Sequence, residues 1–234
     1  MAGNPLRIEH SSRVLVVGQT GSGKSTLVQY MLLPLRNLVI VDPKHQFDPI
    51  QRHEIVTTAE ELETEGNRRT SRNIALVFRP SMEYLDSGEI DEVYGWIFAR
   101  GNTILYNDEL TTIIPNAARY PSKLRAIHTQ GRGKGITCIE ATQRPSGIPG
   151  WIYSETDLFI KFSLATRDDQ KRMAQYMGDT VVEPASYPAE SAHASKHTFY
   201  VYRQGEREPA REYVLDLSNG TETPDDGEDE EDNE

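Results

Sequence analysis

The sequence has little of several features that would place a protein outside the ordinary globular class. Cys138 is the single cysteine, so a disulfide framework is excluded. No basic segment followed by an apolar run opens the chain, and apolar stretches such as Leu38 to Val41 fall far short of the ~18 residues that cross a bilayer. The six histidines show no ligand spacing with the cysteine, which disfavours zinc. These absences predict a cytoplasmic protein without a transmembrane segment.

The charge of the chain is unevenly distributed. Of 234 residues, 37% are hydrophobic, which is enough for one sizeable core, and the formal charge is -11. Eight of the last ten residues are acidic and none is basic, so the remainder is close to neutral. We therefore expect one domain over residues 1–216 and an acidic, disordered tail over 217–234. Residues 111–144 carry six basic side chains against Glu140 alone, which predicts that anions bind near that segment.

Apolar periodicity predicts an alternation of strands and helices. Strands are expected over 13–17, 38–41, 73–78, 103–106 and 136–141. Helices are expected over 24–33, 59–66, 90–98 and 122–130. Further strands at 158–164, 198–202 and 212–215 follow one another more closely, which indicates an antiparallel addition at one edge. The predicted fold class is α/β, with a mainly parallel central sheet flanked by helices.

The most specific motif is a glycine-rich loop between the first predicted strand and helix. Gly18 to Ser25 fits G-x-x-x-x-G-K-[ST], in which backbone N–H groups converge on phosphate oxygens. Lys24 is placed to reach the β and γ phosphates, and Ser25 offers a hydroxyl to Mg²⁺. The motif predicts ATP and Mg²⁺ as ligands. The nucleotide-binding residues we expect are Gly18, Gln19, Thr20, Gly21, Ser22, Gly23, Lys24, Ser25 and Thr26.

Two later strands end in polar residues suited to phosphate chemistry. Asp108 and Glu109 follow the strand at 103–106; Asp108 can complete the Mg²⁺ shell while Glu109 polarises a water. Capping of the next helix is the alternative role for this pair. Gln143 follows the strand at 136–141, and strands of a parallel sheet present ligand-binding groups at their carboxyl ends. We therefore expect Gln143 near the γ-phosphate; a structural loop amide is the alternative.

Together these residues resemble the FtsK/HerA superfamily of RecA-like ATPases. The resemblance rests on GQTGSGKST, on Val41-Asp42-Pro43-Lys44, on Asp108-Glu109 and on residues 130–146, QGRGKGITCIEATQRPS. It implies a RecA-like fold, Glu109 as catalytic base and Gln143 as γ-phosphate sensor. It also implies a homo-oligomeric ring, expected to be a hexamer. Arg132 would complete the neighbouring subunit's site as an arginine finger; Arg119, Arg125 and Arg144 compete for that role, and a solvated basic face is the plain alternative.

Two departures from the family pattern narrow the expected function. Asn107 stands where the family usually has an apolar residue, and no separate DNA-binding or membrane domain is evident. The compact form is more similar to viral genome-packaging ATPases, which implies translocation of double-stranded DNA into a preformed capsid, with a capsid vertex or membrane-associated partner. The alternatives are a conjugation or secretion ATPase that moves DNA or another polymer, a small-molecule kinase or GTPase, and a non-catalytic assembly protein. A guanine-binding N-K-x-D is missing, which disfavours the GTPase.

Overall fold

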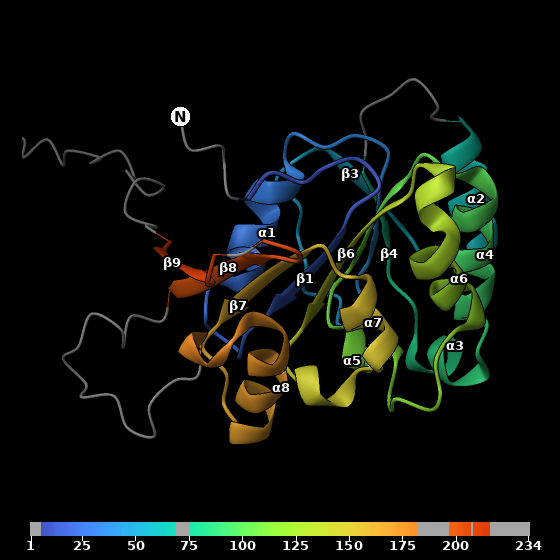
Figure 1. Cartoon of the computed structure of the whole chain (residues 1–234). Helices are drawn as coiled ribbons and strands as arrows, with labels where there is room; N and C mark the ends of the chain where they lie inside the picture. Colours follow the sequence, from blue (N-terminus) through green and yellow to red (C-terminus); the bar gives the residue numbers. More distant parts are fainter. Residues whose placement is uncertain (1–5, 69–74, 182–196, 207, 216–234) are drawn as a thin grey trace, which may run out of the picture.

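The computed structural model describes residues 6–68, 75–181, 197–206 and 208–215 (Figure 1). The predicted acidic tail over 217–234 lies outside the described residues. Within the described part, one sheet has the strand order β3-β4-β2-β5-β6-β1-β7-β8-β9. The strands are β1 (Arg13–Val17), β2 (Leu38–Val41), β3 (His53–Val56), β4 (Ala75–Phe78), β5 (Ile104–Asn107), β6 (Thr137–Thr142), β7 (Leu158–Phe162), β8 (Thr198–Arg203) and β9 (Arg211–Val214).

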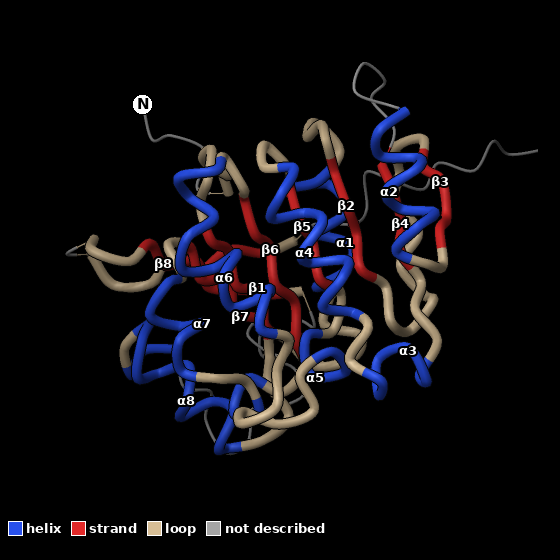
Figure 2. Tube along the Cα trace, turned by 90° about the vertical axis from the view of Figure 1, so that its right-hand side faces the viewer, coloured by secondary structure: helices blue, strands red, loops and turns tan. Residues whose placement is uncertain are grey.

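The sheet is parallel from β3 through β7, while β8 and β9 are antiparallel additions beyond β7. Helices cover both faces (Figure 2), which buries the central strands on both sides and explains their continuous apolar sequences. The helices are α1 (Lys24–Leu32), α2 (Ala59–Arg68), α3 (Met82–Ser87), α4 (Ile90–Arg100), α5 (Leu110–Ile113), α6 (Ser122–Gln130), α7 (Gly150–Glu155) and α8 (Arg167–Met177).

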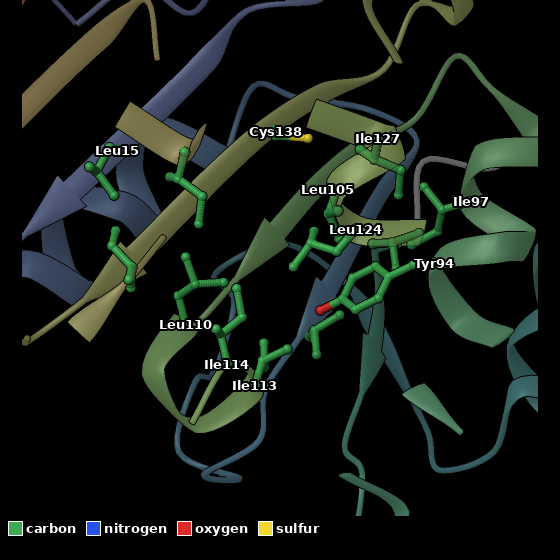
Figure 3. Close-up of a cluster of buried hydrophobic side chains, with 14 of the residues drawn as sticks. Leu15, Tyr94, Ile97, Leu105, Leu110, Ile113, Ile114, Leu124, Ile127 and Cys138 are labelled. Carbon is green, nitrogen blue, oxygen red and sulfur yellow. The ribbon is translucent and has the colours of Figure 1, made fainter. Parts of the chain in front are cut away.

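Alternate residues of each central strand enter two separate cores. In β1, Val14 and Val16 pack with the apolar side of α1, including Leu27 and Val28. The opposite face of the sheet packs against α4 and α6, where Tyr94, Leu105, Leu124 and Ile127 lie together (Figure 3). The sheet is thereby fixed between two layers, and the loops at the carboxyl ends of its strands are held in place.

The predicted α/β class, the parallel sheet and the antiparallel edge are confirmed. The elements that sequence reasoning omitted are short or polar: β3, α3, α5, α7 and α8. Helix α8 has few apolar residues, but Thr166 caps it by accepting a hydrogen bond from the N–H of Asp169, and Met173 and Met177 are buried. The chain after β6 forms a 3₁₀ turn over Pro145–Gly147, and α7 begins at Gly150. None of the helices in the described ranges is both long and apolar enough to span a membrane.

Candidate active site

The glycine-rich loop joins β1 to α1, and its backbone requires glycine at two positions. A Cβ atom at Gly18 would lie 2.6 Å from the Ser22 hydroxyl oxygen and 2.7 Å from Cβ of Phe162. Gly23, the residue before α1, has φ of 94°, a left-handed conformation that L side chains rarely adopt. The loop therefore packs closely on β7 and turns sharply into the helix, so that its N–H groups lie around the helix N-terminus.

A cavity of about 270 Å³ opens at the carboxyl end of the sheet, by which we mean the side where the parallel strands end. It is lined by the loop residues 19–26, by Lys44, Gln46 and Phe47, and by Asp108, Glu109 and Gln143. The hydroxyl oxygen of Ser22 is buried and has no hydrogen-bond partner within the described ranges. An unsatisfied hydroxyl, a buried lysine and a glycine-lined cradle are suited to a polyphosphate, so the residues present fit a nucleotide.

Buried charges of opposite sign meet at the floor of this cavity. Burial lowers the pKa of Lys24, an effect that the nearby carboxylates of Asp108 and Glu109 oppose. Burial raises the pKa of Asp108, although Lys24 opposes the shift and the Tyr106 hydroxyl donates a 2.6 Å hydrogen bond to Asp108 Oδ1. Ser25 and Asp108 both line the cavity, and their oxygens are the ligands that Mg²⁺ prefers. A magnesium ion would be held by this pair.

Glu109 is tightly fixed by its surroundings. It has φ of 66° and lies just before α5, a left-handed conformation that is uncommon for glutamate and clusters at functional sites. Oε1 accepts hydrogen bonds from the hydroxyls of Thr111 and Thr142, at 2.6 and 3.1 Å, and from the N–H of Gln143, at 3.1 Å. Burial raises the pKa of Glu109, but the hydrogen bonds from Thr111, Gln143 and Lys44 outweigh it and the net shift is downward. The carboxylate is therefore ionised and oriented.

Gln143 connects the phosphate-binding loop to Glu109. Its side-chain oxygen accepts a 3.0 Å hydrogen bond from the Thr20 hydroxyl, while its backbone N–H donates to Glu109. The loop that follows is anchored to α8, because the N–H of Ser146 donates to Asp169 Oδ1 at 2.9 Å. The structure thus brings Gln143, Glu109 and the phosphate-binding loop together around one cavity. Their catalytic roles remain predictions.

Arg132 lies elsewhere. It precedes β6 and lies at the amino end of the sheet, by which we mean the side where the parallel strands begin. It does not line the cavity. Its guanidinium group binds both carboxylate oxygens of Asp157, at 2.8 and 3.0 Å, and the side chain is 42% exposed. Arg132 cannot serve the cavity of its own chain, so the predicted arginine-finger role requires a second copy. Of its competitors, Arg119 donates to the carbonyl of Asp86 and Arg125 to the Tyr120 hydroxyl.

A buried polar network behind the site accounts for the unusual Asn107. Asn107 pairs with Glu140 in the register of β5 and β6, and its amide donates to the Glu140 carboxylate at 2.9 and 3.2 Å. The Tyr94 hydroxyl donates to Asn107 at 2.8 Å, and His128 Nε2 lies 2.7 Å from Glu140. Cys138 is close to His128 and Glu140, a grouping that the sequence spacing did not indicate. The signal that could have found this network was two polar residues inside neighbouring apolar strands.

Comparison with known proteins agrees with this site. No family model matches the chain. The chain is 26% identical over 194 residues to the DNA packaging ATPase P9 of Enterobacteria phage PRD1, covering 81% of each protein. It is also 27% identical over 199 residues to the DNA translocase FtsK of Helicobacter pylori, covering 73% of this chain and 23% of that protein. The chain is therefore similar to ATPases of the FtsK/HerA type.

The fold of the chain also occurs in a solved structure. The genome packaging NTPase B204 of Sulfolobus turreted icosahedral virus 2, in complex with sulfate, superposes with a TM-score of 0.67 at 16% identity. The superposition covers 90% of this chain and 99% of B204, so the likeness in fold extends over nearly all of both chains. The RecA-like fold expected from the sequence is confirmed.

Proposed function

We propose that this ATPase is a motor that uses ATP hydrolysis to move double-stranded DNA, and that it packages a viral genome into a preformed capsid. The observation that carries the proposal is the convergence of Lys24, Glu109 and Gln143 on one cavity, in a chain similar to a DNA packaging ATPase over 81% of both lengths. The DNA partner, the capsid setting and a location in the host cytoplasm or the virion are parts of the same proposal.

The residues of the cavity divide the chemistry between them. Lys24 and the N–H groups of the loop bind the phosphates, and Ser25 with Asp108 would hold Mg²⁺. When bound there, the ion would supply neutralisation of the charge that develops on the transferred phosphoryl group. Glu109 orients the attacking water and accepts its proton, because its ionised carboxylate points into the cavity. Gln143 contacts the terminal phosphate and transmits its presence to Glu109 through its backbone N–H.

A ring of identical subunits, proposed to be a hexamer, would complete each site. Arg132 is remote from its own cavity and partly exposed, so a neighbouring copy is the molecule to which it can offer its charge. An arginine supplied in trans stabilises the transition state only when the interface closes, which couples hydrolysis to movement around the ring. A conjugation or secretion motor would share this chemistry and differ in its cargo. The second carboxylate, Glu109, distinguishes both from a small-molecule kinase.

The proposal is tested by steady-state ATP hydrolysis with and without long duplex DNA, at low and at physiological salt. We expect DNA to stimulate hydrolysis, and the stimulation to weaken as salt rises, because phosphate contacts release counterions. Glu109→Gln should lower hydrolysis by a factor of about 10² to 10⁴ while nucleotide binding is retained. A wild-type protein that hydrolyses ATP at the same rate with and without DNA, in every oligomeric state, would contradict the proposal.

A further inference from the structure

Lys44 belongs to the Val41-Asp42-Pro43-Lys44 motif, and none of the roles assigned above uses it. Its ammonium lies 3.0 Å from Oε2 of Glu109, and both side chains line the cavity. Among the described residues, Lys44 is the partner of Oε2, whereas Oε1 accepts the hydrogen bonds from Thr111, Thr142 and Gln143. An ammonium ion on Oε2 therefore occupies the oxygen that is otherwise available to accept a proton from water.

The turn that carries Lys44 is rigidly held. The carboxylate of Asp42 is fully buried and accepts hydrogen bonds from the N–H groups of Gln46 and Phe47 and from Nε of Arg79, at 3.0 to 3.2 Å. Pro43 fixes the backbone before Lys44, and the residue after Lys44 has a φ of 56°. Such a turn fixes the Cα and Cβ atoms of Lys44 beside the cavity, while the rotatable bonds of the side chain allow its ammonium group to change partners.

The same turn contacts the metal-binding side of the site. Phe47 is buried and its ring lies 4.9 Å from the ring of Tyr106, whose hydroxyl donates to Asp108. The segment over residues 42–47 is therefore coupled to both acidic residues: to Glu109 through the ammonium of Lys44, and to Asp108 through the two aromatic rings.

The two members of the ion pair differ in their freedom to move. The Glu109 side chain is 4% exposed and is fixed by three further hydrogen bonds, whereas the Lys44 side chain is 34% exposed. If the pair separates, the lysine is the group that moves. A terminal phosphate placed in the cavity is a competing anion with more negative charge than one carboxylate, and lysine is a common phosphate ligand.

We propose that Lys44 is a nucleotide-responsive positioning residue that holds Oε2 of Glu109 in the empty site and transfers its ammonium to the terminal phosphate of a nucleoside triphosphate. The transfer frees Oε2 to accept the proton of the attacking water. No covalent bond forms or breaks. A diphosphate lacks the group that attracts the ammonium, so Lys44 stays on Glu109 when ADP is bound. This inference rests on the proposed ATPase function and adds the signal that starts hydrolysis.

A direct test follows the Lys44 signal by NMR after reductive ¹³C-methylation of the lysines, with assignment through Lys44→Arg. We expect the signal to move when magnesium and the non-hydrolysable analogue β,γ-methylene ATP are added, and to stay in place with ADP. In Glu109→Gln the signal of the nucleotide-free protein should differ from wild type, because its partner is removed. A Lys44 signal that responds equally to the two nucleotides, or to neither although both bind, would overturn the inference.

Affinities provide the second readout. Lys44→Met should weaken binding of β,γ-methylene ATP about tenfold and binding of ADP less than about twofold, since only the triphosphate contacts the ammonium. Lys44→Arg should restore most of this discrimination, because it keeps the charge. Lys123→Met, which removes an exposed lysine on α6, is the matched control and should change neither affinity. Equal losses for both nucleotides in Lys44→Met would overturn the inference.

These outcomes separate the inference from the proposed function. Wild-type protein that binds neither nucleotide would contradict both. Protein that binds both nucleotides and shows the triphosphate-specific response, but whose hydrolysis ignores DNA, would contradict the motor and leave the role of Lys44 in place.

Discussion

The two ends of the parallel sheet treat their charged groups in opposite ways. At the amino end, Arg13 is fully buried and donates to the carbonyls of Ile127 and Ile136, both at 2.7 Å, while Arg132 binds Asp157. At the carboxyl end, by contrast, Lys24 is buried and faces the cavity together with the acidic pair. Polar groups whose hydrogen bonds are made within the chain stabilise the fold. Polar groups that line a cavity and can still accept or donate hydrogen bonds are available to bind a ligand and support chemistry.

Arg132 combines both kinds of behaviour, because its guanidinium group binds Asp157 within its own chain and is nevertheless proposed to act on a neighbouring subunit. Arg132→Ala should lower DNA-stimulated hydrolysis by the assembled protein by a factor of about 10³ or more, since an arginine finger stabilises transition-state charge. The free energy of unfolding should fall by at most ~1 kcal/mol, because the pair with Asp157 is about 40% exposed.

Steady-state kinetics and urea unfolding check the two parts of this prediction. Arg36→Ala, which removes an exposed arginine from outside the basic segment at 111–144, is the control and should keep wild-type activity. Unchanged hydrolysis in Arg132→Ala would assign this residue to the fold alone and transfer the finger role to a competitor.

Arg13 tests the opposite case of a charge that serves stability. Arg13→Met keeps much of the volume but removes the guanidinium hydrogen bonds to the carbonyls of Ile127, His128 and Ile136. The free energy of unfolding should fall by about 3 kcal/mol, and nucleotide affinity of the folded fraction should not change. Arg36→Met removes an exposed arginine and is expected to be neutral in urea unfolding. If Arg13→Met lowered the binding free energy of the nucleotide by more than it lowers the free energy of unfolding, the proposed difference between the two ends of the sheet would be contradicted.

We predict that the free energy of unfolding depends on pH through Asp169, which anchors the loop that carries Gln143. Burial alone raises the pKa of Asp169, but hydrogen bonds from Thr166 and Ser146 outweigh it, so the pKa in the folded protein is lowered. This stabilisation is fully present above the unfolded pKa and is lost as the pH falls through the folded pKa. The stability difference between wild type and Asp169→Asn, measured by urea unfolding, should therefore shrink from neutral pH to about pH 3. A difference that is constant across this range would contradict the prediction.

The acidic tail offers the smallest expected effect. Deletion of residues 217–234 should raise affinity for duplex DNA about threefold at low salt and leave it unchanged at physiological salt, because exposed charges are screened. Nucleotide affinity should be unaffected. The control keeps the tail and replaces its acidic residues by their amides, and DNA titration should give the same result. Equal DNA affinity of all three proteins at low salt would leave the tail without a role in repelling nucleic acid.

The contrast between local and distant contacts explains how much the sequence could predict. The loop at 18–25 is a contiguous motif whose geometry is set by its own glycines, so its structure follows from a few residues. Gln143 could be placed because the carboxyl ends of parallel strands meet at one side of a sheet. Other contacts join residues that lie 33 to 123 positions apart and therefore depend on strand order. They are those of Lys44 with Glu109, of Asn107 with Glu140 and of Arg13 with two carbonyls. No periodicity in the sequence reveals that order.

One active site is proposed to need the carboxyl end of the sheet of one chain and the amino end of the sheet of its neighbour. Mixing Glu109→Gln with Arg132→Ala tests it most directly, with ATP hydrolysis in the presence of duplex DNA as the readout. Each variant alone should be inactive. The equimolar mixture should recover activity, because about a quarter of the interfaces pair an intact Glu109 with an intact Arg132. A mixture as inactive as its components, in protein shown to form mixed oligomers, would contradict a site shared between subunits.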